Sequence, residues 1–581
     1  MKKQEIANNG VTLYYCKEDT AIDGKLIPAN TVFDIDIDEN VHYVRIQLIE
    51  YLPTINRIAL TDCNKTFPQV TEVLISGDIS IPNAMFPNVK SPRIQGKSIL
   101  NSFYLDENTV IDLAGCTHIG PKAFSGCKAC ELINTEKIRV CSKDSFLESS
   151  FLKQPFINGV KVAGTILIDI DENADNVIIP SYITFVAPSL RETIKKIKTI
   201  TIGNIDSWNH IYKIIESETI ILSDSVGMLN RFGSLSDCKC IKVDKKNPYF
   251  SSRNGLLYNK QMTELLACPY KKTGKVTVPE SVVRIRHLAF HNAKVTSIQL
   301  PSSVCVFESA SFQNCRFLKE MIFTDGIVSI NTAISKFDDY EDVAVCNCPK
   351  LETIVLPKTL NYIGAFFDET VMASNVIIPE GVQIIDNGAL QNVTGDIKLP
   401  DSLKYIGFNN FNSVSSMTAN KYIPGLLSCY DIHGFSEIRY NDIKLTIGNN
   451  VLFISKYDDT ILREIEYKAS LNGLTEEILK DIDEIPLSYE EASLIINNYS
   501  LRKNEKLKEY IVKESGHIGM KCIRENDANL LLNLLNTGLV SKERLKVLLH
   551  MSNDKGNTLM SAYIMEYINQ STEQEEKDFV L

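Results

Sequence analysis

The chain has 581 residues, a formal net charge of -11 and 44% hydrophobic residues. This length exceeds a single compact core, so we expect several domains or one elongated repeat array. The negative charge argues against a sequence-independent grip on nucleic-acid phosphates, and short basic runs such as Lys195-Lys196 and Lys271-Lys272 are expected to be solvated surface. No segment combines the length and apolarity of a membrane span, so we expect no insertion into a membrane.

The N-terminus and the cysteines bear on the compartment. Residues 1–10 are basic and polar and lack the apolar stretch of a secretory signal. The 15 cysteines are odd in number, and without an export signal we expect reduced thiols rather than a disulfide framework. The sequence therefore predicts a cytoplasmic protein, with the cell surface or secretion by a non-classical route as the alternative.

Residues 1–110 carry only weak strand patterns, at residues 26–28, 73–75 and 79–82. We interpret them as degenerate β-rich repeats, because the open end of a repeat array exposes apolar surface and needs a cap.

A clear unit recurs between residues 270 and 412. An apolar run is followed by a proline and then by apolar residues three, six and about eleven positions later. Pro279 and Pro301 are 22 residues apart, as are Pro357 and Pro379, and Pro400 follows after 21. One further unit without proline fits at residues 323–330, and residues 335–343 interrupt the spacing as a loop. A spacing of 21 or 22 residues is the period of a short solenoid coil.

Each unit predicts one short strand before the proline, with alternate residues such as Ile298 and Leu300 facing inward. Proline supplies no amide to a ladder and starts a turn at the same place in every coil. Because a single coil cannot bury its apolar face, the coils must stack with their strands parallel. Phe290 and Phe312 are expected to form rungs of the core.

Residues 119–127, which include Ala123, Phe124 and Cys127, and residues 310–318 closely resemble the second half of a BspA-like leucine-rich repeat. Residues 247–258 look like the longer irregular coil of that family. The resemblance implies an α+β protein with a leucine-rich-repeat solenoid over residues 111–450, one parallel strand per coil of about 22 residues.

Apolar residues recur at helical spacing after residue 455, as in Leu530, Leu531, Leu534 and Leu535. Residues 488–491 have the form of a capping box, and residues 536–538 and 553–556 are expected to separate short helices. We therefore predict a small all-α C-terminal domain over residues 455–581.

Several residues suggest metal chemistry, and we reject each of them. Cys127 and Cys130 have the spacing of half a zinc site, but no second pair completes it, and Cys127 falls on the inward cysteine position of the repeat. His287 and His291 lie four apart where no long helix is expected. The acidic pairs, Asp338-Asp339 and Glu476-Glu477, are expected to be an exposed loop and a helix start.

The nucleotide-binding, nucleophile-elbow and metalloprotease motifs are absent from the sequence. We therefore expect a protein that is not an enzyme, with no catalytic residue, no metal and no cofactor.

The remaining candidate for a functional site is the exposed surface of the solenoid. The outward strand positions lie five, four and two residues before each proline or its equivalent and are expected to form a concave sheet that binds a protein partner. The candidate partner-binding residues are Thr296, Ser297, Gln299, Lys319, Glu320, Glu352, Thr353, Ser374, Asn375, Asp396 and Lys398. The same positions also place the apolar residues Ile322, Val355 and Ile377 outward, together with Gly395.

Three functions fit this sequence. The first is non-enzymatic recognition or scaffolding of a protein partner in the cytoplasm. The second is adhesion to host matrix or to other cells, which the resemblance implies because the BspA-like family includes bacterial surface proteins. The third makes the repeats a targeting module for a helical effector domain. The sequence identifies no partner.

Overall fold

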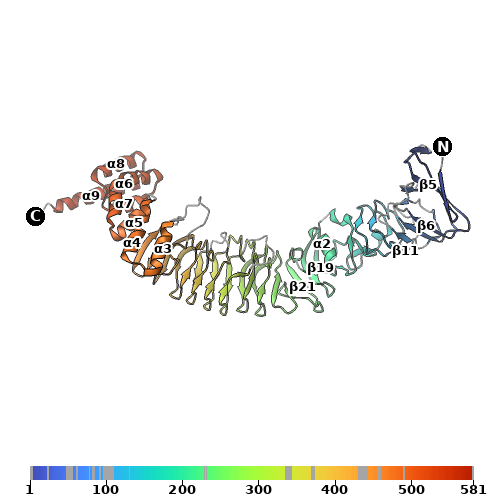
Figure 1. The fold of residues 1–581 in the computed structure, drawn as a ribbon, viewed down its shortest axis with the longest axis horizontal. Helices are drawn as coiled ribbons and strands as arrows, with labels where there is room; N and C mark the ends of the chain where they lie inside the picture. Colours follow the sequence, from blue (N-terminus) through green and yellow to red (C-terminus); the bar gives the residue numbers. More distant parts are fainter. Residues whose placement is uncertain are drawn as a thin grey trace. The chain divides into compact units, whose positions relative to one another are not determined.

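The computed structural model divides the chain into two compact units, residues 1–261 with 267–272 and residues 262–266 with 273–581 (Figure 1). It describes residues 4–22, 25–47, 57–60, 63–76, 79–80, 85–89, 93–95, 107, 110–129, 131–192, 194–227, 229, 232–333, 343–367, 373–429, 443–454, 460–488 and 491–578.

The first unit begins with an antiparallel hairpin, β1 (Gln4–Asn8) and β2 (Val11–Tyr15). Asn9 and Gly10 connect the two strands, both with positive φ, as a two-residue hairpin turn requires. β2 pairs antiparallel with β5 (Thr31–Ile37), and parallel pairing continues to β7 (Arg57–Ala59) and β9 (Ile79–Ser80). The hairpin thus forms hydrogen bonds with the backbone groups at the outer edge of β5, the first strand of the parallel ladder.

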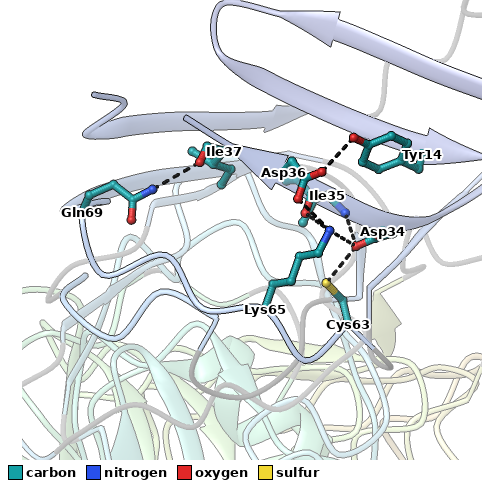
Figure 2. Close-up of polar contacts among 8 residues, drawn as sticks. All are labelled: Tyr14, Asp34, Ile35, Asp36, Ile37, Cys63, Lys65 and Gln69. Atoms are coloured by element: carbon teal, nitrogen blue, oxygen red, sulfur yellow. Dashed lines mark hydrogen bonds and ion pairs between the residues drawn. The ribbon is translucent and has the colours of Figure 1, made fainter. Parts of the chain in front are cut away.

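A cluster around Lys65 ties the loop before β8 to strand β5 (Figure 2). Lys65 Nζ lies 2.8 Å from Asp34 Oδ1 and 2.7 Å from Asp36 Oδ1. Tyr14 donates to Asp36 Oδ2 at 2.7 Å, and the Cys63 thiol donates to Asp34 Oδ1 at 3.3 Å. One ammonium group therefore forms ion pairs with two carboxylates on the same strand.

Parallel strands already stack in this N-terminal region, ahead of residue 110. A five-stranded sheet comprises β6 (Tyr43–Gln47), β8 (Glu72–Ser76), β10 (Arg93–Gln95), β11 (Val110–Asp112) and β13 (Glu131–Ile133). Two short strands, β12 (His118–Ile119) and β14 (Val140–Cys141), form a second ladder. A single-turn helix, α1 (Ser150–Lys153), follows.

A second parallel sheet of this unit comprises β17 (Asn176–Ile179), β19 (Lys195–Ile202), β20 (Ile215–Leu222) and β21 (Cys240–Val243). Helix α2 (Ile205–Ile211) connects β19 to β20 and buries Trp208. The expectation that Lys195 is solvated is wrong. Lys195 takes an inward position of β19 and is only 8% exposed, with Nζ 3.8 Å from Asp169 Oδ1.

Two antiparallel hairpins interrupt the coils of this unit. The first pairs β15 (Val160–Ala163) with β16 (Ile166–Ile170), and β16 also pairs with β18 (Phe185–Val186). The second pairs β22 (Phe250–Arg253) with β23 (Leu256–Asn259) across Asn254 and Gly255, which have positive φ. This second hairpin is the irregular coil predicted over residues 247–258.

The first sheet of the second unit contains the predicted strands of the coils up to the one before Pro379, and its strands lie side by side in Figure 1. They are β25 (Thr273–Thr277), β27 (Lys294–Leu300), β29 (Glu320–Phe323), β32 (Thr353–Val355) and β34 (Asn375–Ile377). Met321 of β29 pairs with Ile354 of β32, a step of 33 residues, so this coil contains the predicted insertion. The inserted residues 335–342 lie outside the described residues.

A separate sheet continues the stack after β34. Its strands are β36 (Thr394–Lys398), β38 (Ser413–Ala419), β39 (Ile443–Ile447) and β40 (Asn450–Ile454). β39 and β40 are antiparallel, so the parallel ladder ends there.

Each coil also contains a second, shorter strand, where the sequence predicted only one. These strands form two further parallel ladders: β24 (Glu264–Ala267), β26 (Arg284–Ile285), β28 (Val306–Glu308) and β31 (Thr332–Ala333), then β30 (Ser329–Ile330), β33 (Tyr362–Ile363), β35 (Ile384–Ile385) and β37 (Tyr405–Ile406). Their buried residues, such as Ile285 and Ile363, occupy the apolar positions six residues after the proline or its equivalent.

The core of the second unit lies between these ladders. Phe290 and Phe312 are fully buried, with ring centroids 5.1 Å apart, and the prediction that they are core residues is confirmed. The repeat cysteines contribute as well. Cys315 donates to the carbonyl of Phe290 and Cys348 to that of Phe312, both at 3.1 Å, so each thiol links its coil to the preceding one.

Of the 14 cysteines in the described part of the chain, all but Cys240 and Cys305 are buried. Burial raises the pKa of Cys116 to about 12 and that of Cys141 to about 11. The prediction of mostly buried thiols is therefore confirmed for these residues.

Helices follow the last strand, as predicted. They are α3 (Thr460–Asn472), α4 (Glu476–Glu484), α5 (Ala492–Arg502), α6 (Glu505–Glu525), α7 (Ala528–Asn536), α8 (Lys542–Asp554) and α9 (Thr558–Asp578). The breaks after Asn536 and Asp554 are confirmed. The capping box at Ser488 is wrong, because α5 begins after Glu491 without a side-chain cap, and Ser488 ends a short 3-10 helix. The domain boundaries at residues 110 and 450 remain predictions.

Buried polar side chains attach the helices to the last coil. Glu466 of α3 accepts hydrogen bonds from the Tyr422 hydroxyl and from the backbone of Gly425 and Leu427, and burial raises the pKa of its carboxyl group. The side-chain amide of Asn498 donates to the Phe453 carbonyl and accepts from the Phe453 N–H, both at 3.1 Å. Asn498 thereby pairs with the edge of β40 as a neighbouring strand would.

Candidate recognition face

The candidate site is the outer face of the sheet from β25 to β34, called here the outer face. Parallel register aligns its side chains in rows that cross the strands. Between the rows, Ile298, Met321, Ile354 and Val376 point inward and are buried. The backbone beneath the outer face is therefore fixed by the core.

One row is apolar over three successive strands. Gln299 pairs with Ile322, Ile322 with Val355 and Val355 with Ile377. Val355 is 42% exposed and Ile377 is 82% exposed. We call Ile322, Val355 and Ile377 the apolar stripe. An isoleucine with so much of its surface in water gains from burial against a partner.

The neighbouring row is polar. Ser297, Glu320, Thr353 and Asn375 are aligned in register on the same four strands. Ser297 donates to Glu320 Oε2 at 2.8 Å, and Asn375 Nδ2 donates to Thr353 Oγ1 at 3.4 Å. This row borders the apolar stripe on one side with hydrogen-bonding groups.

The structure places the predicted residues as follows. Exposed residues are Thr296, Lys319, Glu352, Ser374, Asn375, Asp396 and Lys398, and partly exposed residues are Ser297, Gln299, Glu320 and Thr353. All lie at outward positions, but Asp396 and Lys398 belong to β36, which begins a separate hydrogen-bonded sheet. There Asp396 accepts a hydrogen bond from Ser416 at 2.5 Å.

The prediction of candidate residues omitted the apolar stripe. Ile322, Val355 and Ile377 each lie two residues before the proline or its equivalent, an outward position by strand alternation. An apolar residue at that position in three successive coils is the signal that could have identified the stripe from sequence.

The rejected metal candidates have structural roles where they are described. Cys127 is 1% exposed, and Cys130 lies outside the described residues. His287 Nδ1 lies 2.7 Å from the Ser309 carbonyl, and Glu476 and Glu477 form the first turn of α4. Asp338 and Asp339 are not described.

The described residues contain no group of three or more histidine, cysteine, aspartate or glutamate side chains placed to share a metal ion. None of their helices is long and apolar enough to cross a membrane.

Comparison with known proteins supports the repeat assignment. The BspA-type leucine-rich-repeat region matches residues 97–215, 268–344 and 338–458 in six copies, which together cover more than half of the chain. No curated protein sequence matches this chain.

Solved structures with low identity also align with it. A leucine-rich cell surface protein from Faecalibacterium prausnitzii is 16% identical over 69% of this chain and 90% of its own, with a TM-score of 0.24. A leucine-rich-repeat protein from Bacteroides ovatus is 14% identical over 71% and 94%, with a TM-score of 0.25. The pneumococcal vaccine antigen PcpA is 14% identical over 71% and 87%, with a TM-score of 0.25. With its six matched copies, the chain belongs to the BspA-type leucine-rich-repeat family.

Proposed function

We propose that this protein recognises a protein partner through the outer face and performs no catalysis. The observation that carries this proposal is the apolar stripe, in which Ile322, Val355 and Ile377 are aligned across three strands. An apolar centre bordered by polar groups is the arrangement of protein interfaces. The partner would cover the stripe and form hydrogen bonds with the row that contains Glu320 and Thr353.

The rigidity of the outer face supports the same function. Its outward residues alternate with fully packed inward residues such as Ile298 and Met321, both 0% exposed. A backbone held in this way needs little ordering when a partner binds, so more of the contact energy contributes to affinity. Extended contact along a repeat array is also the usual binding mode of solenoids.

We place this function in the cytoplasm, with the cell surface as the alternative. The buried thiols with raised pKa values, such as those of Cys116 and Cys238, fit a reducing compartment, where thiols stay protonated and reduced. Fractionation of the source cell distinguishes the two. Labelling of the protein on intact cells by a membrane-impermeant reagent would favour the alternative that it is an adhesin.

The test is affinity capture of a partner by the full chain, followed by measurement of its Kd with Val355→Asp combined with Ile377→Asp. We expect Kd to rise at least about tenfold, because two charges replace the apolar centre. Folding stability is expected to change by less than about 0.5 kcal/mol, because both side chains are exposed. The matched control is Val283→Asp with Val328→Asp, two exposed valines that lie outside the outer face.

A second variant tests the polar residues of the outer face and its edge. Lys319→Glu with Glu352→Lys and Asn375→Ala changes charge and hydrogen bonding without touching the stripe, and it is expected to weaken binding less. If both variants bind the partner like the unmodified chain, the outer face is not the interface. Loss of binding after changes in α6–α9 would then assign recognition to the helices.

A further inference from the structure

The first unit contains a hollow of about 540 Å³ over strands β19, β20 and β21. β19 and β21 are labelled in Figure 1. The hollow is lined by Lys196, Ile197, Lys198, Glu216, Ser217, Glu218, Lys239 and Lys271. Four of these side chains are cationic and two are anionic, so the lining carries a net positive charge in a chain whose formal net charge is -11.

The cations differ in how they are neutralised. Lys239 Nζ lies 2.6 Å from Glu218 Oε1, and Lys271 Nζ lies 3.0 Å from Asp237 Oδ1. Lys196 and Lys198 form no ion pair within the described part of the chain. Both are exposed and lie two residues apart on β19, so their ammonium groups project from the same face of the strand. Lys196 lies opposite Glu216 in the register of β19 and β20, but no ion pair holds Lys196 or Lys198 among the described residues, so the hollow offers two cations to an incoming anion.

We propose that this hollow binds an acidic peptide segment of a partner protein. The carboxylates of an acidic peptide can be spaced so that they approach Lys196 and Lys198. Neutral or basic residues of the same peptide would then lie opposite Glu216 and Glu218, the two glutamates among these lysines. A nucleic acid presents closely and evenly spaced phosphates, which these two glutamates would repel. The site is distinct from the outer face, and it would give the protein a second, electrostatic contact.

The probe is a fluorescein-labelled peptide of alternating glutamate and serine, titrated with the full chain and followed by anisotropy at low salt. Its controls are the same peptide with glutamine for glutamate and a labelled single-stranded oligothymidylate. We expect saturable binding of the glutamate peptide alone, weakening as salt is added, since exposed charges are screened. Equal binding of the glutamine peptide would overturn the proposal, and tighter binding of the oligothymidylate would replace it with nucleic-acid recognition.

Two variants locate the binding. Lys196→Glu with Lys198→Glu is expected to raise Kd at least about tenfold, because it turns two attractive charges into repulsive ones. The matched control, Lys128→Glu with Lys137→Glu, reverses two exposed lysines of the first unit that do not line the hollow. An equal loss in both would mean that only overall charge matters and would refute the site.

Glu216→Gln provides a test of opposite sign. It removes a repulsive charge from the lining, so we expect Kd to fall about twofold or more. A variant that merely damaged the fold would weaken binding, so tighter binding separates an electrostatic role from a structural one. Unchanged or weaker binding by a folded Glu216→Gln protein would contradict the proposal.

Discussion

The stacked rings of Phe290 and Phe312 make a specific stability prediction, because both side chains are 0% exposed. Phe312→Ala is expected to lower the free energy of unfolding by about 3 to 5 kcal/mol through lost burial and the cavity left behind. Gln299→Ala, at a partly exposed outward position, serves as the control and is expected to cost little. Equal denaturant midpoints for the two variants would show that the ring is not a core residue.

The cluster around Lys65 predicts a pH dependence in the N-terminal strands (Figure 2). Burial raises the pKa of Asp34, but hydrogen bonds from Lys65 and Cys63 outweigh it and lower the pKa. Hydrogen bonds from Lys65 and Tyr14 lower the pKa of Asp36. The cluster therefore stabilises the fold above the usual carboxyl pKa, and this contribution is lost as pH falls through the lowered values.

Lys65→Met removes the shared ammonium group. We expect it to cost at most about 1 kcal/mol at pH 7, because the Lys65 side chain is 39% exposed and its ion pairs are screened by solvent. The difference between Lys65→Met and the unmodified chain is expected to shrink as pH is lowered from 6 to about 2, through the lowered carboxyl pKa values. Hydrogen exchange in β5 measures it, and a difference that stays constant with pH would exclude the ion pairs as the cause.

At the scale of elements, two polar side chains of α5 hold β40, because Arg502 donates to the Val451 carbonyl and Asn498 pairs with Phe453. Asn498→Ala removes both hydrogen bonds to Phe453 and leaves a backbone N–H and C=O without partners, at an expected cost of about 1 to 3 kcal/mol. Asn497→Ala, a half-buried neighbour of the same residue type, is the matched control. Faster hydrogen exchange at Phe453 in the first variant alone would support the role of the amide.

The predicted strands lie just before prolines that recur at a regular spacing in the sequence. Pro301, Pro357 and Pro379 each follow a strand, and the apolar residues before them face the core, so period and proline together located these elements. The same strand alternation predicted which residues point outward. It did not predict which of these residues a partner contacts, because alternation gives the direction of a side chain and not its contribution to binding.

Other features lacked such signals or were misread. Arg284–Ile285 is too short for any periodicity to mark a strand. Lys195 was assigned to the surface by residue type, although the register of β19 turns it inward beside Asp169. The hairpin at Asn9-Gly10 did carry a signal, because that dipeptide favours positive φ at both turn positions.

At the scale of the whole molecule, each coil pairs only with its neighbours, so damage is expected to remain local. Phe312→Ala is expected to accelerate hydrogen exchange in β27, β29 and β32 and to leave β6, β8 and β11 unchanged. Mass spectrometry of peptides after exchange distinguishes this from global unfolding. Uniform acceleration along the chain would indicate that the coils unfold as a single cooperative body.

The pairing of Asn498 with β40 affects how a repeat protein can gain coils without also forming filaments. The open edge of a sheet is a template to which another chain can add, and repeated addition builds a filament. Here the terminating group is supplied by a helix that follows the last strand, and the internal coils contribute nothing to it. Gene duplication of an internal coil would therefore lengthen the outer face by one strand and leave its termination intact.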